Sequence, residues 1–169
     1  MTRLMGSQVV VADSAEATRS IGTALAQVVR AGDLLVLSGD LGAGKTTFTQ
    51  GLAEGLGVRG DVTSPTFVIS RVHPPLANGP ALVHVDAYRL GESAELDDLD
   101  LDASLDDAVT VVEWGTGLAE ALAEDRLEVE VLRAHGDEPG EARTLHVTAV
   151  GDRWAGVDLT FLGGRTADA

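Results

Sequence analysis

The stretch that decides the fold of this chain is Gly39-Asp40-Leu41-Gly42-Ala43-Gly44-Lys45-Thr46. It fits the Walker A pattern, in which a glycine and four further residues precede Gly-Lys-Thr. Glycines allow a turn whose backbone N–H groups surround an anion, and the following helix adds its N-terminal dipole. A lysine gives a compact positive charge to the β- and γ-phosphates, and a threonine hydroxyl can bind Mg²⁺. We therefore predict a phosphate-binding loop here.

The residues on either side have the order that such a loop requires. Asp33 to Leu37 reads Asp-Leu-Leu-Val-Leu, which predicts a strand buried on both faces. Lys45 to Leu56 reads as a helix that ends at Gly57. A chance match would be a glycine-rich turn with an ordinary lysine, and the strand before and the helix after argue against it.

Lys45 is unusual among the basic residues of this chain. The sequence has 12 bases and 27 acids, so the formal net charge is 12 − 27 = −15. Lys45 is the only lysine, and every other base is arginine. The exception lies where a point charge suits better than a planar guanidinium. The net negative charge argues against a large direct interface with nucleic acid or with an anionic membrane.

Composition excludes several kinds of site and location. The absence of cysteine excludes disulfides, iron–sulfur clusters, cysteine-bound zinc and a cysteine nucleophile. Apolar runs such as Val9-Val10-Val11-Ala12 are far shorter than the roughly 20 residues of a membrane-spanning helix. No apolar segment follows Arg3 as it would in a signal peptide. We therefore expect no membrane contact and a cytoplasmic location.

The remaining pattern interleaves helices and strands. We expect a helix from an N-cap at Asp13 to a stop near Gly32, then further strands and helices after the loop. The expected strands are 81–87, 109–112, 127–132 and 144–150, and the expected helices are 92–107 and 117–124. This order predicts an α/β fold of the P-loop NTPase type, with a mixed sheet that has a parallel core, antiparallel strands and flanking helices. We expect a single domain over residues 1–162 and a frayed tail over 163–169.

Three further positions could complete a nucleotide site. Glu113 and Asp86 each end an apolar run, where a P-loop enzyme places a carboxylate that holds Mg²⁺ directly or through water. Either acid could also be a solvated strand end. Thr66 lies in Thr63-Ser64-Pro65-Thr66-Phe67, where switch loops occur, although a proline turn explains the same residues. His84 interrupts its apolar run and suggests a buried, hydrogen-bonded structural histidine.

The nucleotide is inferred by elimination. Guanine-specific P-loop proteins read the base with an Asn-Lys-x-Asp loop. The only lysine here lies in the phosphate loop and the only asparagine is Asn78, so that loop cannot exist. We therefore expect ATP as the ligand.

Four motifs together resemble the TsaE (YjeE) family, the ATPases of bacterial tRNA threonylcarbamoyladenosine modification. They are the stretch from Gly39 to Phe48, Ser64-Pro65-Thr66-Phe67, His84-Val85-Asp86-Ala87-Tyr88-Arg89-Leu90 and Glu113-Trp114, and the resemblance extends from about Asp13 to Val150. Residues 71–75 and the stretch after Val150 depart from the family pattern.

The resemblance implies a P-loop ATPase that supports repeated turnover of a TsaD–TsaB complex, so that tRNA is met only through the partners. We expect hydrolysis by the chain alone to be slow, because no arginine finger is evident in the sequence. It implies ATP and Mg²⁺ as cofactors, Lys45, Asp86, Glu113 and Thr66 in catalysis, and Thr46, Glu113 and Asp86 at the metal. The implied nucleotide contacts are Gly39, Asp40, Leu41, Gly42, Ala43, Gly44, Lys45, Thr46, Thr47, Ala15, Trp114 and Arg143.

Two other functions remain open from the sequence. A P-loop small-molecule kinase would usually carry a lid with several arginines, whereas the arginines here are scattered. A non-catalytic, nucleotide-gated binding module would not need Thr46, Asp86 and Glu113 together.

Overall fold

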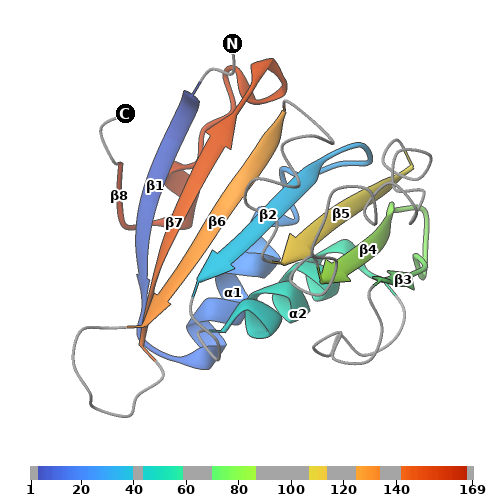
Figure 1. Cartoon of the computed structure of the whole chain (residues 1–169), viewed down its shortest axis with the longest axis horizontal. Helices are drawn as coiled ribbons and strands as arrows, with labels where there is room; N and C mark the ends of the chain where they lie inside the picture. The colour runs from blue at the N-terminus through green and yellow to red at the C-terminus, as the bar shows by residue number, and fades with distance from the viewer. Residues whose placement is uncertain are drawn as a thin grey trace.

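The computed structural model describes residues 4–39, 44–58, 70–86, 107–113, 125–133 and 142–166. These residues form an eight-stranded sheet with two α-helices on one face (Figure 1). The strands are β1 (Leu4–Ala12), β2 (Leu34–Gly39), β3 (Ser70–His73), β4 (Ala81–Asp86), β5 (Ala108–Glu113), β6 (Arg126–Arg133), β7 (Arg143–Val150) and β8 (Arg165–Thr166). The helices are α1 (Ala15–Leu25) and α2 (Lys45–Leu56), with short 3-10 turns η3 (Asp152–Trp154) and η4 (Thr160–Leu162).

The sheet is mixed, as the sequence predicts. Its strand order is β3-β4-β5-β2-β6-β7-β1-β8. The four strands β4, β5, β2 and β6 run parallel, and the pairs beyond them are antiparallel. The carboxyl ends of the parallel strands therefore meet at one edge, which is where open α/β sheets bind their ligands.

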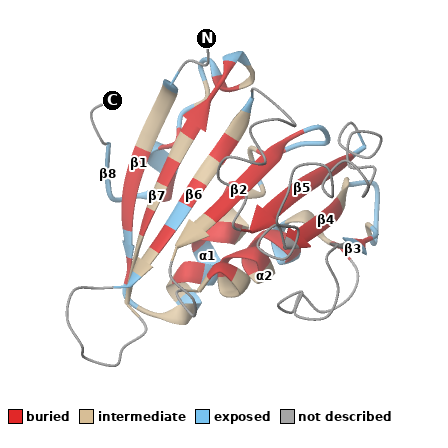
Figure 2. Ribbon diagram, in the orientation of Figure 1, coloured by how far each residue is buried: buried red, intermediate tan, exposed pale blue. Residues whose placement is uncertain are grey.

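Strand β2 lies at the centre of the buried layer. Leu34, Leu35 and Leu37 are fully buried and Val36 is nearly so (Figure 2). Burying each such leucine contributes roughly 1.5–3 kcal/mol. Because β2 pairs with β5 on one side and β6 on the other, its final residue is fixed in position at the ligand-binding edge.

Helices α1 and α2 approach each other closely enough for their backbones to touch. A Cβ on Gly51 would lie 1.8 Å from the carbonyl oxygen of Arg19, and one on Gly22 would lie 2.2 Å from that of Phe48. Glycine is therefore required at both positions, and the loop helix α2 is held firmly against α1.

The ends of α1 differ from the sequence prediction. The N-cap is Ser14, not Asp13, because the Ser14 side chain accepts a hydrogen bond from the Ala17 N–H at 3.1 Å. The helix ends at Leu25 rather than near Gly32. Gly32 instead lies in the turn before β2, with φ 97° and its N–H donated to the Ala108 carbonyl.

The two ends of the chain form strands that the sequence did not reveal. Strand β1 pairs antiparallel with β7, and β8 pairs with β1. The expectation of a frayed tail from Gly163 is corrected for residues 163–166: the Gln8 amide donates to the Gly163 carbonyl at 2.6 Å, and its oxygen accepts from Thr166 at 3.2 Å.

The predicted strands 81–87, 109–112, 127–132 and 144–150 are confirmed as β4 to β7, with ends that differ by one residue. The helices predicted over 92–107 and 117–124 lie outside the described residues, apart from Asp107. Among the described residues, none of the helices has the length and apolar character needed to cross a membrane.

Candidate functional site

The predicted phosphate loop connects β2 to α2 at the carboxyl edge of the parallel strands. Gly39 ends β2 and Gly44 is the N-cap of α2, and both have positive φ, 132° and 108°. A Cβ on Gly39 would lie 2.0 Å from the Val131 carbonyl oxygen of β6. Neither position tolerates a side chain readily, since there is no space for a Cβ at Gly39 and both glycines have a left-handed backbone. The strand predicted before the loop and the helix predicted after it are confirmed, whereas residues 40–43 between them lie outside the described residues.

Lys45 begins α2 and turns its side chain back toward the strand. It is 6% exposed, and its Nζ donates a hydrogen bond to the Gly39 carbonyl at 3.1 Å. The ammonium therefore lies at the end of β2, close to the N-terminal end of α2. Positive charge and N–H donors that converge in this way suit a phosphate group.

Glu113 ends the neighbouring strand β5 at the same edge. It lies opposite Leu37 of β2 on one side and opposite Asp86 of β4 on the other. Glu113 is buried, at 4% exposure for the whole residue, and its Oε1 has no hydrogen-bond partner among the described residues. The Asp86 side chain is outside the described residues, so the structure places only its backbone.

This edge has one oxygen ligand that could bind a hard divalent cation, Glu113 Oε1. A buried carboxylate oxygen without a hydrogen bond is a natural Mg²⁺ ligand. Within the described ranges there is no group of three or more histidine, cysteine or acidic residues that could hold a metal. A cation here would therefore depend on Glu113, the Thr46 hydroxyl at the start of α2 and oxygens of a bound nucleotide, which is how Mg²⁺ usually binds.

The structure brings two further predicted residues together between α1 and α2. Ala15 and Thr47 line a groove of about 620 Å³ between α1 and α2, together with Glu16, Arg19, Ser20, Thr23, Gln50 and Glu54. The predicted residues Asp40, Leu41, Gly42, Ala43, Thr66 and Trp114 lie outside the described residues. Their predicted roles are neither supported nor contradicted.

Arg143 approaches the loop from the start of β7. Its Nε lies 4.0 Å from the place that a Cβ on Gly44 would occupy, and side-chain atoms of Thr18 and Val131 lie at 3.8 and 3.9 Å. Arg133 is opposite Arg143 in the antiparallel pair β6–β7. Thr18, Val131 and Arg133 were not predicted, because only long-range packing brings α1, β6 and β7 close to Gly44.

His84 of β4 is buried as expected, but its environment differs from the prediction. Its Nε2 lies 3.4 Å from Glu113 Oε1, and neither ring nitrogen makes a hydrogen bond within the described residues. The expected hydrogen-bonded structural histidine is therefore not what these residues show. Its nearest charged neighbour is the predicted metal-binding carboxylate.

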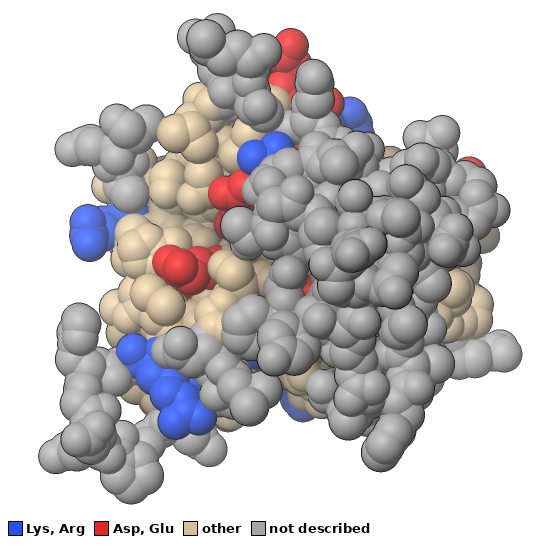
Figure 3. Space-filling model, viewed as in Figure 1, with Lys and Arg blue, Asp and Glu red and all other residues tan. Residues whose placement is uncertain are grey.

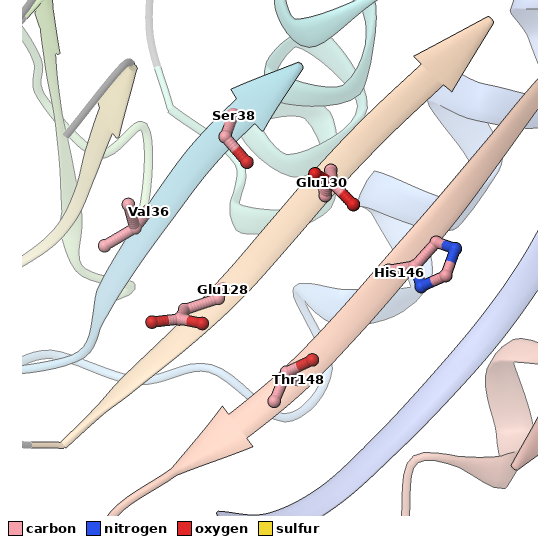
Figure 4. Close-up of a pocket in the computed structure, with 6 residues that line it drawn as sticks. All are labelled: Val36, Ser38, Glu128, Glu130, His146 and Thr148. Carbon is pink, nitrogen blue, oxygen red and sulfur yellow. The ribbon is translucent and has the colours of Figure 1, made fainter. Parts of the chain in front are cut away.

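A second hollow lies on the opposite face of the sheet, away from the helices. Its volume is about 310 Å³, and it is lined by Val36, Ser38, Glu128, Glu130, His146 and Thr148 (Figure 4). Figure 3 shows acidic side chains on this face and basic ones where β6 ends and β7 begins. Because β-strand side chains alternate, these residues point away from the face of the sheet that the helices cover.

Comparison with known proteins places these features in a family. The family model described as "Threonylcarbamoyl adenosine biosynthesis protein TsaE" matches residues 12–144. A Streptomyces coelicolor protein named tRNA threonylcarbamoyladenosine biosynthesis protein TsaE is 62% identical over 147 residues, 86% of this chain and 99% of that protein. A Bacillus subtilis protein of the same name is 42% identical over 140 residues, 82% of this chain and 84% of that protein.

A solved structure agrees with this result. The crystal structure of YdiB from Bacillus subtilis superimposes with a TM-score of 0.66 and 36% sequence identity. The superposition covers 91% of this chain and 90% of that one. The predicted α/β fold is thus supported by an experimentally determined relative as well as by the strand order.

Proposed function

The chain belongs to the TsaE family, and from this premise we propose that it is an ATPase that supports threonylcarbamoyladenosine modification of tRNA. One observation carries the proposal: buried Lys45 and buried Glu113 both lie at the end of β2, since Lys45 donates to the Gly39 carbonyl and Glu113 lies opposite Leu37. A cationic and an anionic group, both shielded from water, suit a nucleotide phosphate and its metal ion.

Each residue has a distinct task in this proposal. Lys45 holds the β- and γ-phosphates together with backbone N–H groups at the start of α2. Thr46 and Glu113 would hold Mg²⁺, and Asp86 would hold the ion or a water molecule beside it. Bound Mg²⁺ would neutralise phosphate charge. Arg143 would contact the nucleotide near Gly44.

The chain alone is expected to hydrolyse ATP slowly, because P-loop hydrolases commonly need a partner to complete the site. We propose TsaD and TsaB as these partners, on the strength of the family resemblance. Their participation would also account for a tRNA-modifying role in a chain of net charge −15, since the partners would then bind the RNA.

The first test measures ATP binding by calorimetry with wild-type chain, Lys45→Ala and Arg165→Ala, in the presence of Mg²⁺. Arg165 is the control, since it is an exposed base on β8. Wild type and the control should bind alike, and Lys45→Ala should bind at least about tenfold more weakly, the loss of a charge-assisted contact. Equal binding by Lys45→Ala would contradict the site assignment.

The second test reconstitutes tRNA modification with TsaD and TsaB under multiple-turnover conditions, with and without this chain. The proposal predicts more product and faster ATP consumption when the chain is present. ATP consumption that stays at background would favour a nucleotide-gated binding module. Phosphate transfer to a metabolite without any partner would favour a kinase.

A further inference from the structure

We propose that His84 is a positioning residue, whose Nε2 holds the Glu113 carboxylate in the orientation that binds a divalent cation. The proposal rests on the function proposed above, in which Glu113 binds Mg²⁺. It assigns His84 a role that its place in an apolar strand does not suggest.

The first argument is geometric. His84 Nε2 and Glu113 Oε1 lie 3.4 Å apart on adjacent parallel strands. Glu113 is in register with Asp86, two residues beyond His84, so the contact runs diagonally across the β4–β5 pair. Both side chains lie on the helix-bearing face, since they alternate in phase with the core residues Leu82 and Val111.

The second argument concerns the cost of burial. His84 is fully buried and the Glu113 side chain is 5% exposed. A carboxylate withdrawn from water is costly unless a polar partner faces it. Among the described residues, His84 is that partner. Because full burial restricts the rotation of the imidazole, the contact limits the directions in which the carboxylate can point.

The third argument is that the contact leaves the carboxylate available to bind a cation. Oε1 makes no hydrogen bond within the described part of the chain, so the approach of His84 does not use up its acceptor capacity. A carboxylate that is held but not saturated can still bind a cation. Outer partners of metal-binding side chains typically change metal affinity by about 10–100-fold when removed.

The alternative is that His84 only fills space in the core. Glutamine and asparagine separate the two explanations, because the glutamine amide nitrogen can reach the position of Nε2 and the shorter asparagine amide cannot. The same pair of substitutions at His146, on the opposite face of the sheet, provides the matched control (Figure 4).

The experiment measures Mn²⁺ affinity by electron paramagnetic resonance with ADP bound, and ADP affinity without metal. His84→Asn should weaken Mn²⁺ binding by about 10–100-fold. His84→Gln should stay within about threefold of wild type, ADP affinity without metal should not change, and the His146 variants should match wild type. Equal Mn²⁺ affinity in all variants, or a His84→Gln variant as weak as His84→Asn, overturns the proposal.

A Glu113→Gln variant separates this inference from the proposed function. If Glu113→Gln leaves Mn²⁺ affinity unchanged, the metal assignment itself is wrong. If Glu113→Gln weakens Mn²⁺ binding and the His84 variants do not, only the role of His84 is wrong.

A measurement on the wild-type chain covers the case in which His84→Asn does not fold. In protein labelled with ¹⁵N-histidine and bound to ADP, Mg²⁺ should shift the His84 ring resonances, which are assigned by elimination with variants of the other histidines. Resonances that do not move on Mg²⁺ addition would overturn the proposal.

Discussion

Arg153 binds the carboxylate of Asp33 through two parallel contacts, Nε to Oδ1 and Nη2 to Oδ2, each 2.9 Å long. The same Nη2 donates to the Val28 carbonyl at 2.9 Å, and the guanidinium lies 4.2 Å above the ring of Trp154. Asp33 directly precedes β2, so these contacts connect the segment after β7 to the strand that leads into the phosphate loop.

Removing Arg153 should destabilise the whole domain. The Asp33 side chain is 4% exposed, and Arg153→Ala would leave its carboxylate buried without the guanidinium. Breaking such a pair from one side costs about 3 kcal/mol or more. For a domain of this size that corresponds to a fall in melting temperature of roughly 6–12 °C, measurable by calorimetry.

Arg19→Ala is the matched control for this prediction. Arg19 pairs with Glu54 at 3.5 Å, but the two side chains are 45% and 59% exposed. Exposed pairs contribute less than about 1 kcal/mol. A melting temperature for Arg153→Ala no lower than that of Arg19→Ala would show that the buried pair does not hold the C-terminal segment.

Gly51→Ala should also destabilise the fold, although alanine is the better helix former by about 1 kcal/mol. The new methyl carbon would lie 1.8 Å from the Arg19 carbonyl oxygen, so α1 and α2 would have to separate. Overpacking of this kind costs about 1–3 kcal/mol. The control is Gly6→Ala, where nothing lies within 4 Å of the added carbon. A stabilised Gly51→Ala variant, as judged by urea denaturation, would rule out the close helix contact.

The sequence revealed the central part of the fold because its signals are local. The buried run before Gly39, the glycines of the loop and the helix after Lys45 are adjacent in the chain, and each suggests its own structure. Strand β1 was missed because its pairing with β7 joins residues such as Leu4 and Val150 that are far apart in sequence. The segment after Val150 depends on the long-range contact of Arg153 with Asp33.

The candidate site was likewise predictable only where the signal is local in the sequence. The sequence predicted that Lys45 and Glu113 each follow an apolar strand at the ligand-binding edge. The structure places both residues at that edge. The contact of His84 with Glu113 comes from the register of β4 and β5, and the approach of Arg143 to Gly44 comes from the packing of β7 near the start of α2. No spacing within one segment could have indicated these contacts.

Lys45→Arg should bind ATP as poorly as Lys45→Ala, although it keeps the positive charge. The lysine side chain is 6% exposed and its Nζ reaches the Gly39 carbonyl, so the space suits an ammonium group. A guanidinium is larger and planar. Fluorescent-nucleotide titration should show at least about tenfold weaker binding, and the reverse exchange Arg165→Lys should have no effect. An arginine variant with wild-type affinity would mean that charge alone is sufficient at this position.

Arg143→Ala should weaken ATP binding and leave adenosine binding unchanged. The Arg143 Nε lies 4.0 Å from the place that a Cβ on Gly44 would occupy, and Gly44 is the N-cap of the helix expected to bind phosphate. A charge-assisted hydrogen bond contributes about 1.5–3 kcal/mol, so calorimetry should show a loss of roughly 10–100-fold. Arg165→Ala removes the same charge at an exposed position on β8 and should leave affinity unchanged. Equal losses for ATP and adenosine would place Arg143 at the base instead, and no loss for either would remove it from the site.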